Sequence, residues 1–136
     1  MYLLDTNVIS EMIKKTPVPG VMEHLEQHEN ELVTASPVWH ELNFGWSRLP
    51  DSKRKKQIET FLLEVILPNI DILPYDHKAA VWHARERARL SSSGRTPPFV
   101  DGQIAGIAAV NNLTLVTRNV RDFNCFRDLR IENWHQ

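Results

Sequence analysis

The sequence predicts an α/β fold in which helices cover both faces of a central, mostly parallel sheet of four to five strands. Two observations support this class. Short apolar stretches alternate with longer segments whose apolar residues recur at helical spacing. Proline, glycine and capping residues separate these segments, and helices between strands provide the crossovers that parallel strands need. No repeat or domain boundary interrupts the 136 residues, so we expect a single domain over residues 1–136.

The first half of the chain contains two strand candidates and four helix candidates. The stretch "TPVPG" ends the first helix, because proline cannot continue a helix and glycine permits the turn. Ser36 and Pro37 suit the N-cap and the first helical position of a later helix, and Asp51 or Ser52 caps the next one. The expected elements are a strand at 2–4, helices at 7–15 and 21–29, a strand at 31–36, and helices at 36–46 and 51–67.

The second half alternates more clearly. Asp76 is expected to cap a long helix, and "SSSGRTPP" is the clearest loop in the chain. The small residues of "FVDGQIAGIAAVNN" allow a helix to pack closely against a sheet. The expected elements are strands at 70–75, 113–117 and 129–134, the last of them at an edge, and helices at 77–90 and 99–112.

Composition indicates a globular protein without a strong electrostatic field. The hydrophobic content is 42% and the formal net charge is −1 at pH 7, so no overall basic field indicates nucleic-acid binding. Cys125 is alone, which excludes an internal disulfide and is typical of a reducing cytoplasm. No apolar run approaches the ~20 residues that cross a bilayer, and the N-terminus lacks the basic flank of a signal peptide. A cytoplasmic protein without a membrane segment is expected.

Four acidic residues fall where functional sites gather in parallel sheets. Asp5 directly follows the first strand, and Glu41 lies about one turn into the helix after the second strand. Asp101 lies near the start of the small-residue helix, and Asp122 follows the strand at 113–117. Because sites in open parallel sheets form outside the carboxyl ends of the strands, we expect these side chains to converge there.

Converging carboxylates have an electrostatic requirement. Each raises the pKa of its neighbours unless a positive charge intervenes. Mg²⁺ or Mn²⁺ accepts oxygen ligands from carboxylates and phosphates and can activate water for attack on a phosphodiester. The alternative is that each acid alone is a helix cap, a turn residue or a solvated helix residue. Each acid lies beside a hydrophobic anchor, where a merely solvated acid is less expected. The joint pattern of four acids therefore favours metal-assisted phosphodiester hydrolysis.

Five segments of the sequence resemble the PIN-domain family, and within it the VapC/FitB-like toxins of type II toxin–antitoxin pairs. They match the family's landmarks in order and spacing over nearly the whole chain. The first motif alone is weakly specific, whereas the segments in register are strongly specific. The resemblance implies a PIN-like three-layer fold. The matching segments are "YLLDTNVIS", "SPVWHELNFG", "PPFVDGQIAGIA", "LTLVTRNVRDF" and "LRIENW".

The resemblance also implies roles for individual residues. Asp5, Glu41 and Asp101 are similar to the three core acids of PIN ribonucleases, with Asp5 and Asp101 binding Mg²⁺ or Mn²⁺. Family members place the fourth acid either at the position of Asn119 or three residues later, at Asp122. We assign it to Asp122 as the fourth catalytic acid. Thr6, Asn7, Thr117 and Asn119 are expected as supporting polar residues, although caps and turns would explain them equally well.

The function that the resemblance implies is a metal-dependent endoribonuclease toxin with a cognate antitoxin, acting as a homodimer or in a hetero-oligomer with the antitoxin. The alternative is a PIN-fold binding module that acts mainly within a DNA-bound toxin–antitoxin complex and has little nuclease activity. The complete set of four acids argues against an inert module.

Basic residues and histidines have competing interpretations. Arg95, Arg85 and Arg118 are candidates for guiding an RNA backbone to the acids, against the alternative of a solvated surface. His24 and His28 lie four residues apart on one helix, and we interpret them as surface residues rather than metal ligands.

Overall fold

Five short parallel strands form a single sheet at the centre of the protein. The structure is a computed structural model that describes residues 1–136. The strand order is β3-β2-β1-β4-β5, and every neighbouring pair is parallel. The predicted fold class is confirmed and each predicted strand is present, the first with its predicted bounds and the other four shorter than predicted. The strands are β1 (Tyr2–Leu4), β2 (Leu32–Ala35), β3 (Asp71–Leu73), β4 (Thr114–Val116) and β5 (Arg130–Glu132).

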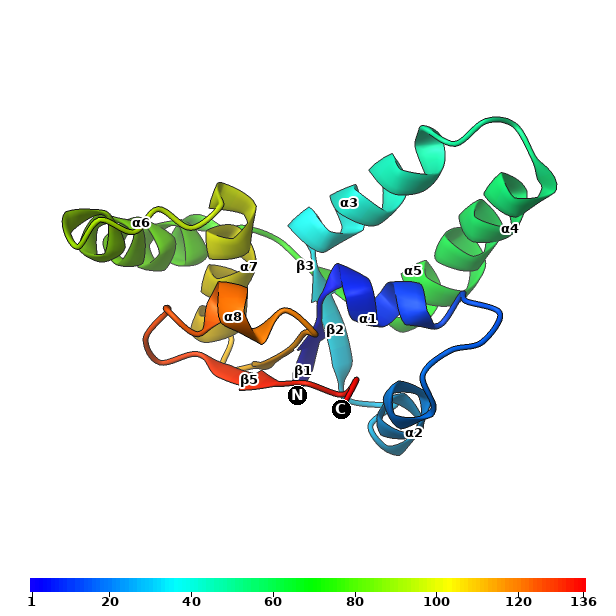
Figure 1. Ribbon diagram of the computed structural model, residues 1–136, viewed down its shortest axis with the longest axis horizontal. Coiled ribbons are helices and arrows are strands. Elements are labelled where there is room, and N and C mark those ends of the chain that lie inside the picture. The colour runs from blue at the N-terminus through cyan, green and yellow to red at the C-terminus, as the bar shows by residue number, and fades with distance from the viewer.

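Helices cover both faces of this sheet. In Figure 1, α6, α7 and α8 lie on one side of the central strands, and α1, α2, α4 and α5 lie on the other. Helix α3 contacts α1, α4 and α7, so it joins the two sides. No helix combines the length and hydrophobicity that crossing a bilayer requires. The helices are α1 (Thr6–Glu11), α2 (Pro19–Gln27), α3 (Ser36–Ser47), α4 (Lys53–Phe61), α5 (Leu67–Asn69), α6 (His77–Ser92), α7 (Phe99–Val110) and α8 (Val120–Phe123), with a π-helix, η1 (Leu62–Ile66), between α4 and α5.

Two of the three N-caps predicted at Ser36, at Asp51 or Ser52, and at Asp76 are confirmed by side-chain hydrogen bonds. Ser52 accepts the N–H of Lys55 at 3.1 Å, and Asp76 accepts the N–H of Ala79 at 2.9 Å. Ser36 was wrong as an N-cap. It is the first residue of α3, because β2 runs into the helix without an intervening loop.

The helix predicted over 51–67 is present from Lys53 and extends to Asn69, but a π-helical segment that was not predicted interrupts its α-geometry. Pro68 lacks the N–H that would continue an α-helical ladder, and its ring crowds the carbonyl four residues earlier. Just before this proline the helix changes from α- to π-geometry in η1. There the N–H of Leu67 donates to the carbonyl of Leu62, five residues earlier. The four-residue helix α8 was missed because it is too short to show a period.

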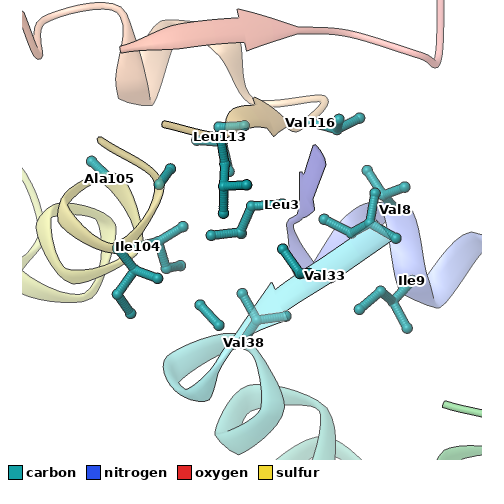
Figure 2. Close-up of a cluster of buried hydrophobic side chains, with 14 of the residues drawn as sticks. Leu3, Val8, Ile9, Val33, Val38, Ile104, Ala105, Leu113 and Val116 are labelled. Atoms are coloured by element: carbon teal, nitrogen blue, oxygen red, sulfur yellow. The ribbon is translucent and has the colours of Figure 1, made fainter. Parts of the chain in front are cut away.

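The core lies on both sides of the central strands, with α7 packed on one side and α1 on the other (Figure 2). Leu3 and Leu4 of β1 and Leu115 and Val116 of β4 are completely buried, since both faces of these strands are covered. Burial of each leucine contributes about 1.5–3 kcal/mol. This packing fixes the carboxyl ends of β1 and β4. The side chains of α7 that join the core are Ile104, Ala105, Ile107 and Ala108.

His24 lies on a partly exposed helix and His28 directly follows it, and their rings pack inward rather than into solvent. Both rings are half-buried and stack on Trp134, with centroids 5.0 Å and 5.7 Å from the Trp134 ring. Trp134 is 1% exposed and also lies 5.2 Å from the ring of Tyr2. These contacts hold the end of the chain beside β1, and the two termini lie near each other in Figure 1.

Candidate functional site

Asp5 is both a helix cap and a buried acid at the carboxyl end of β1. Its side chain is almost fully buried, and its backbone N–H donates to the carbonyl of Val116 at 3.0 Å. Oδ1 accepts the N–H of Thr6 at 2.8 Å, which caps α1. Oδ2 accepts the Thr117 hydroxyl at 2.8 Å and the Asn7 amide at 3.5 Å. The two interpretations of Asp5 therefore coincide, one for each carboxylate oxygen.

Polar side chains connect the ends of β1 and β4 around this acid. The Thr6 hydroxyl donates to Oε2 of Glu41 at 2.7 Å. Asn7 Oδ1 accepts the N–H of Arg118 at 3.1 Å, and Thr117 Oγ1 accepts the N–H of Asn119 at 3.0 Å. Thr6, Asn7 and Thr117 thus contact the acids directly, as supporting residues would. Asn119 contributes its backbone N–H to the network.

Two further acids reach the same place from helices. Glu41 lies in the second turn of α3, and Asp101 lies in the first turn of α7. Together with Asp5 they line one pocket of about 430 Å³ at the carboxyl edge of the sheet, which we call the acid pocket. The prediction that topology would bring these three acids together agrees with this geometry. The other residues that line the acid pocket are Thr6, Asn7, Ser10, Lys14, Ile104, Arg118, Asn119 and Phe123.

Close packing fixes the turn of α7 that carries Asp101. A Cβ at Gly102 would collide with the ring of His83, so only glycine fits there. His83 is buried, and its Nδ1 is hydrogen-bonded to the Tyr75 hydroxyl at 2.8 Å. Burial lowers the pKa of His83, which keeps the ring neutral at pH 7.

The acid pocket brings three carboxylates together, and two of them have a raised pKa. Burial, together with the charges of Asp122, Asp5 and Glu41, raises the pKa of Asp101 to about 6. Burial also raises the pKa of Asp5, against the opposing hydrogen bonds from Thr117 and Thr6. An acid whose pKa is raised by burial and like charges marks a candidate functional site.

The fourth acidic position remains shared between two residues. Asn119 lines the acid pocket, whereas Asp122 is exposed on α8 and does not line it. The charge of Asp122 nevertheless acts on both neighbours, because it raises the pKa of Asp101 and of Asp5. The assignment to Asp122 stays a prediction.

The donor set suits a hard divalent cation. No three acidic, histidine or cysteine side chains lie close enough to enclose an ion by themselves. Mg²⁺ commonly binds through one or two carboxylates and keeps several waters, which is the coordination this pocket offers. Asp5 and Asp101 could supply those carboxylates, since both have a raised pKa that a bound cation would reverse.

Sequence reasoning missed two polar residues of the acid pocket, Ser10 and Lys14. Ser10 comes four residues after Thr6 on α1, and Lys14 comes four residues later, beyond the end of α1; this spacing was the available signal. Of the predicted RNA-contacting arginines, Arg118 lines the pocket. Arg85 lines a separate pocket beside α6, and Arg95 lies on the exposed loop before α7.

A second, mainly hydrophobic groove adjoins the acid pocket. It measures about 420 Å³, lies between α1, α3 and α4, and shares Thr6, Ser10 and Glu41 with the acid pocket. Phe44, which lines it, is 55% exposed. We call this surface the apolar groove. Exposed hydrophobic surfaces of this kind mark sites of interaction with other molecules.

Comparisons with known proteins agree with this geometry. The family model described as "PIN domain" matches residues 2–129. The chain is 32% identical to the tRNA(fMet)-specific endonuclease VapC of Shigella flexneri, over 98% of this chain and 97% of that protein. It is 34% identical to toxin FitB of Neisseria gonorrhoeae, over 99% of both chains.

Solved structures show the same fold. The structure of FitAB bound to an IR36 DNA fragment superposes with a TM-score of 0.91 at 29% identity, covering 100% of this chain and 96% of that one. VapBC2 from Rickettsia felis, bound to a DNA fragment from its promoter, gives a TM-score of 0.83 at 30% identity, with 98% of each chain covered.

Proposed function

The chain belongs to the PIN-domain family and to its VapC/FitB branch, and from that premise we propose that it is a metal-dependent endoribonuclease, the toxin of a type II toxin–antitoxin pair. The observation that carries the proposal is the acid pocket, where Asp5, Glu41 and Asp101 meet at the carboxyl edge of the sheet. The Shigella relative is named as a tRNA-specific endonuclease, which supports RNA as the substrate class.

Each acid has a distinct part in this mechanism. Asp5 and Asp101 would hold Mg²⁺ or Mn²⁺, and Thr117 and Asn7 keep Asp5 oriented through their hydrogen bonds. The bound ion would supply activation of water and stabilisation of charge on the phosphate. Glu41, oriented by Thr6, would help to hold the ion or accept a proton from the attacking water. Asp122 would complete the acidic pocket or hold a second ion.

The reaction is hydrolysis of an RNA phosphodiester. The water oxygen forms a bond to phosphorus, one P–O ester bond breaks, and the leaving oxygen takes up a proton. No oxidant or covalent intermediate is required. The protein's contribution is to hold the phosphate and the water in line within the acid pocket.

The apolar groove supports a cognate antitoxin as partner. Relatives were solved as FitAB and VapBC complexes. A segment of the antitoxin that occupies the apolar groove would reach Glu41 and Thr6, which the groove shares with the acid pocket. Binding there would block the acids. We further propose a homodimer, alone or within a hetero-oligomer with the antitoxin, and a single PIN domain over residues 1–136.

A second candidate function is a binding module that acts within a DNA-bound toxin–antitoxin complex. The observation that favours it is that similar structures were solved on DNA fragments. This candidate predicts that the free protein cleaves RNA slowly or not at all.

A cleavage assay on the purified chain, free of any partner, separates the two functions. Total cellular RNA is incubated with the protein in Mg²⁺, in Mn²⁺ or in EDTA, and we expect cleavage only with a metal. Asp101→Asn should abolish cleavage and leave the circular dichroism spectrum unchanged. Asp71→Asn, an exposed acid on β3, is the matched control and should cleave like the parent. Full cleavage by Asp101→Asn would contradict the site, and no cleavage by the parent would favour the binding module.

A further inference from the structure

Two basic side chains flank the acid pocket, and they come from distant parts of the sequence. Lys14 follows α1, and Arg118 follows β4. Both line the pocket together with the three acids. Since the acids repel RNA phosphates, cations at the rim are needed to hold a polyanion over them even when a metal ion is bound.

A buried carboxylate fixes the position of Lys14. The ammonium Nζ of Lys14 lies 2.9 Å from Oε2 of Glu11, and the side chain of Glu11 is only 1% exposed. Oε1 of Glu11 accepts the N–H of Val18 at 2.8 Å. The ring of His135 lies against the same carboxylate, with Nε2 3.4 Å from Oε2. Glu11 itself does not line the acid pocket.

Glu11 is charged at neutral pH, so it attracts Lys14 throughout the neutral range. The Lys14 ammonium and the Val18 N–H lower the pKa of Glu11 to about 2. Lys14 is still half exposed, with 50% of its side chain accessible. An ammonium has three donors, so Lys14 can pair with the charge of Glu11 and still donate to a phosphate. The side chain is therefore oriented and accessible at the same time.

From these contacts, and resting on the proposed ribonuclease function, we infer that Lys14 binds the RNA phosphate backbone at the rim of the acid pocket, with Glu11 as its positioning residue. The RNA strand then crosses the acids between Lys14 and Arg118. This path follows α1 and the β4–α8 turn, away from Arg85 beside α6 and from the loop that holds Arg95.

The sequence provides a matched control in the next residue. Lys15 is exposed and does not line the acid pocket. Binding of fluorescently labelled transfer RNA is measured by anisotropy at several salt concentrations, on the full chain carrying Asp101→Asn to prevent cleavage. We expect Lys14→Gln to weaken binding about tenfold and to reduce the salt slope by about one phosphate contact. Lys15→Gln should bind within about twofold of its parent, and Lys14→Arg should restore binding.

Kinetics and metal binding separate this role from a structural one. In the cleavage-competent chain, Lys14→Gln should raise KM more than it lowers kcat, and the Mn²⁺ affinity measured by calorimetry should stay unchanged. Glu11→Gln should raise KM in the same direction. Its effect should not add to that of Lys14→Gln in the double variant, because both act on one contact. The melting temperature of each variant identifies any loss of folding.

Equal RNA affinity and salt slope in Lys14→Gln and Lys15→Gln would overturn the inference and leave the ribonuclease function intact. A parent chain that cleaves no RNA in either metal would overturn the proposed function, and this inference with it. A lower Mn²⁺ affinity in Lys14→Gln would also overturn it, because the side chain would then act on the metal site.

Discussion

The two ends of α1 each have a buried carboxylate, and their pKa values shift in opposite directions. Asp5, before the helix, is 6% exposed, and Glu11, at its last residue, is 1% exposed. Burial raises the pKa of Asp5, whereas the pKa of Glu11 is lowered to about 2. Burial alone disfavours the charged form of both groups, so the difference comes from their neighbours.

Those neighbours differ in charge rather than in number. Glu11 faces the ammonium of Lys14 and the N–H of Val18. Asp5 receives hydrogen bonds only from neutral groups, and the charges of Glu41 and Asp122 oppose its ionisation. A buried acid that the protein neutralises itself serves structure or positioning. A buried acid whose pKa is raised instead marks a candidate functional site.

Replacing each acid by its amide tests this difference most directly. Asp5→Asn should remove metal binding and lower the cleavage rate by about a thousandfold or more, because a catalytic ion contributes several kcal/mol. Glu11→Gln should keep its Mn²⁺ affinity within about twofold, since the carboxylate does not line the acid pocket. Calorimetry with Mn²⁺ and the RNA cleavage rate measure both effects. A similar loss of Mn²⁺ affinity in the two variants would show that Asp5 and Glu11 do not differ in metal binding.

The melting temperature should depend more on Glu11 than on the acids of the acid pocket. Glu11→Ala leaves the partly buried Val18 N–H without its acceptor and Lys14 without its partner. We expect it to lower the melting temperature at neutral pH more than any single amide replacement in the acid pocket. The stabilisation by Glu11 is present above its unfolded pKa of about 4.5 and is lost as pH falls toward about 2. Thermal melts from neutral to acidic pH should therefore show the parent approaching Glu11→Ala; a constant difference would contradict the ion pair.

The sequence alone was sufficient to predict the position of Asp5 at the start of α1, but not the surroundings of Glu11 at its end. Asp5 could be placed from the strand that precedes it, because a continuous apolar strand ends at a defined edge of a parallel sheet. Glu11 could not, since its partners include His135, and only the folded chain brings the end of the sequence to α1. The same limit applies to Asn119 and Asp122, whose positions depend on the geometry of the short helix α8.

The Thr117 hydroxyl tests how far Asp5 depends on its neutral neighbours. It donates to Oδ2 of Asp5 at 2.8 Å and accepts the N–H of Asn119 at 3.0 Å. Thr117→Val removes these bonds and the one that the hydroxyl accepts from the Asn7 amide at 3.4 Å, at nearly constant volume. It should weaken Mn²⁺ binding about tenfold, as loss of a residue that orients a metal ligand commonly does. Thr117→Ser keeps the hydroxyl and is the control. Equal Mn²⁺ affinity in the valine and serine variants would show that Asp5 is oriented without this bond.

The smallest expected effect is the dependence of the metal-free fold on the charge of Asp101. Its pKa is raised from 3.8 to about 6, first by burial and then by Asp122, Asp5 and Glu41. Protonation therefore stabilises the folded state: the contribution is fully present below about pH 4 and is lost as pH rises through about 6. In EDTA, Asp101→Asn should melt about 3 °C higher than the parent at neutral pH, a modest gain because solvent screens this partly exposed group. The difference should vanish near pH 4 and reverse when Mg²⁺ or Mn²⁺ is added, since only the parent keeps both carboxylates for the ion. A clear loss of melting temperature in the metal-free variant at neutral pH would instead assign Asp101 a capping role at the start of α7.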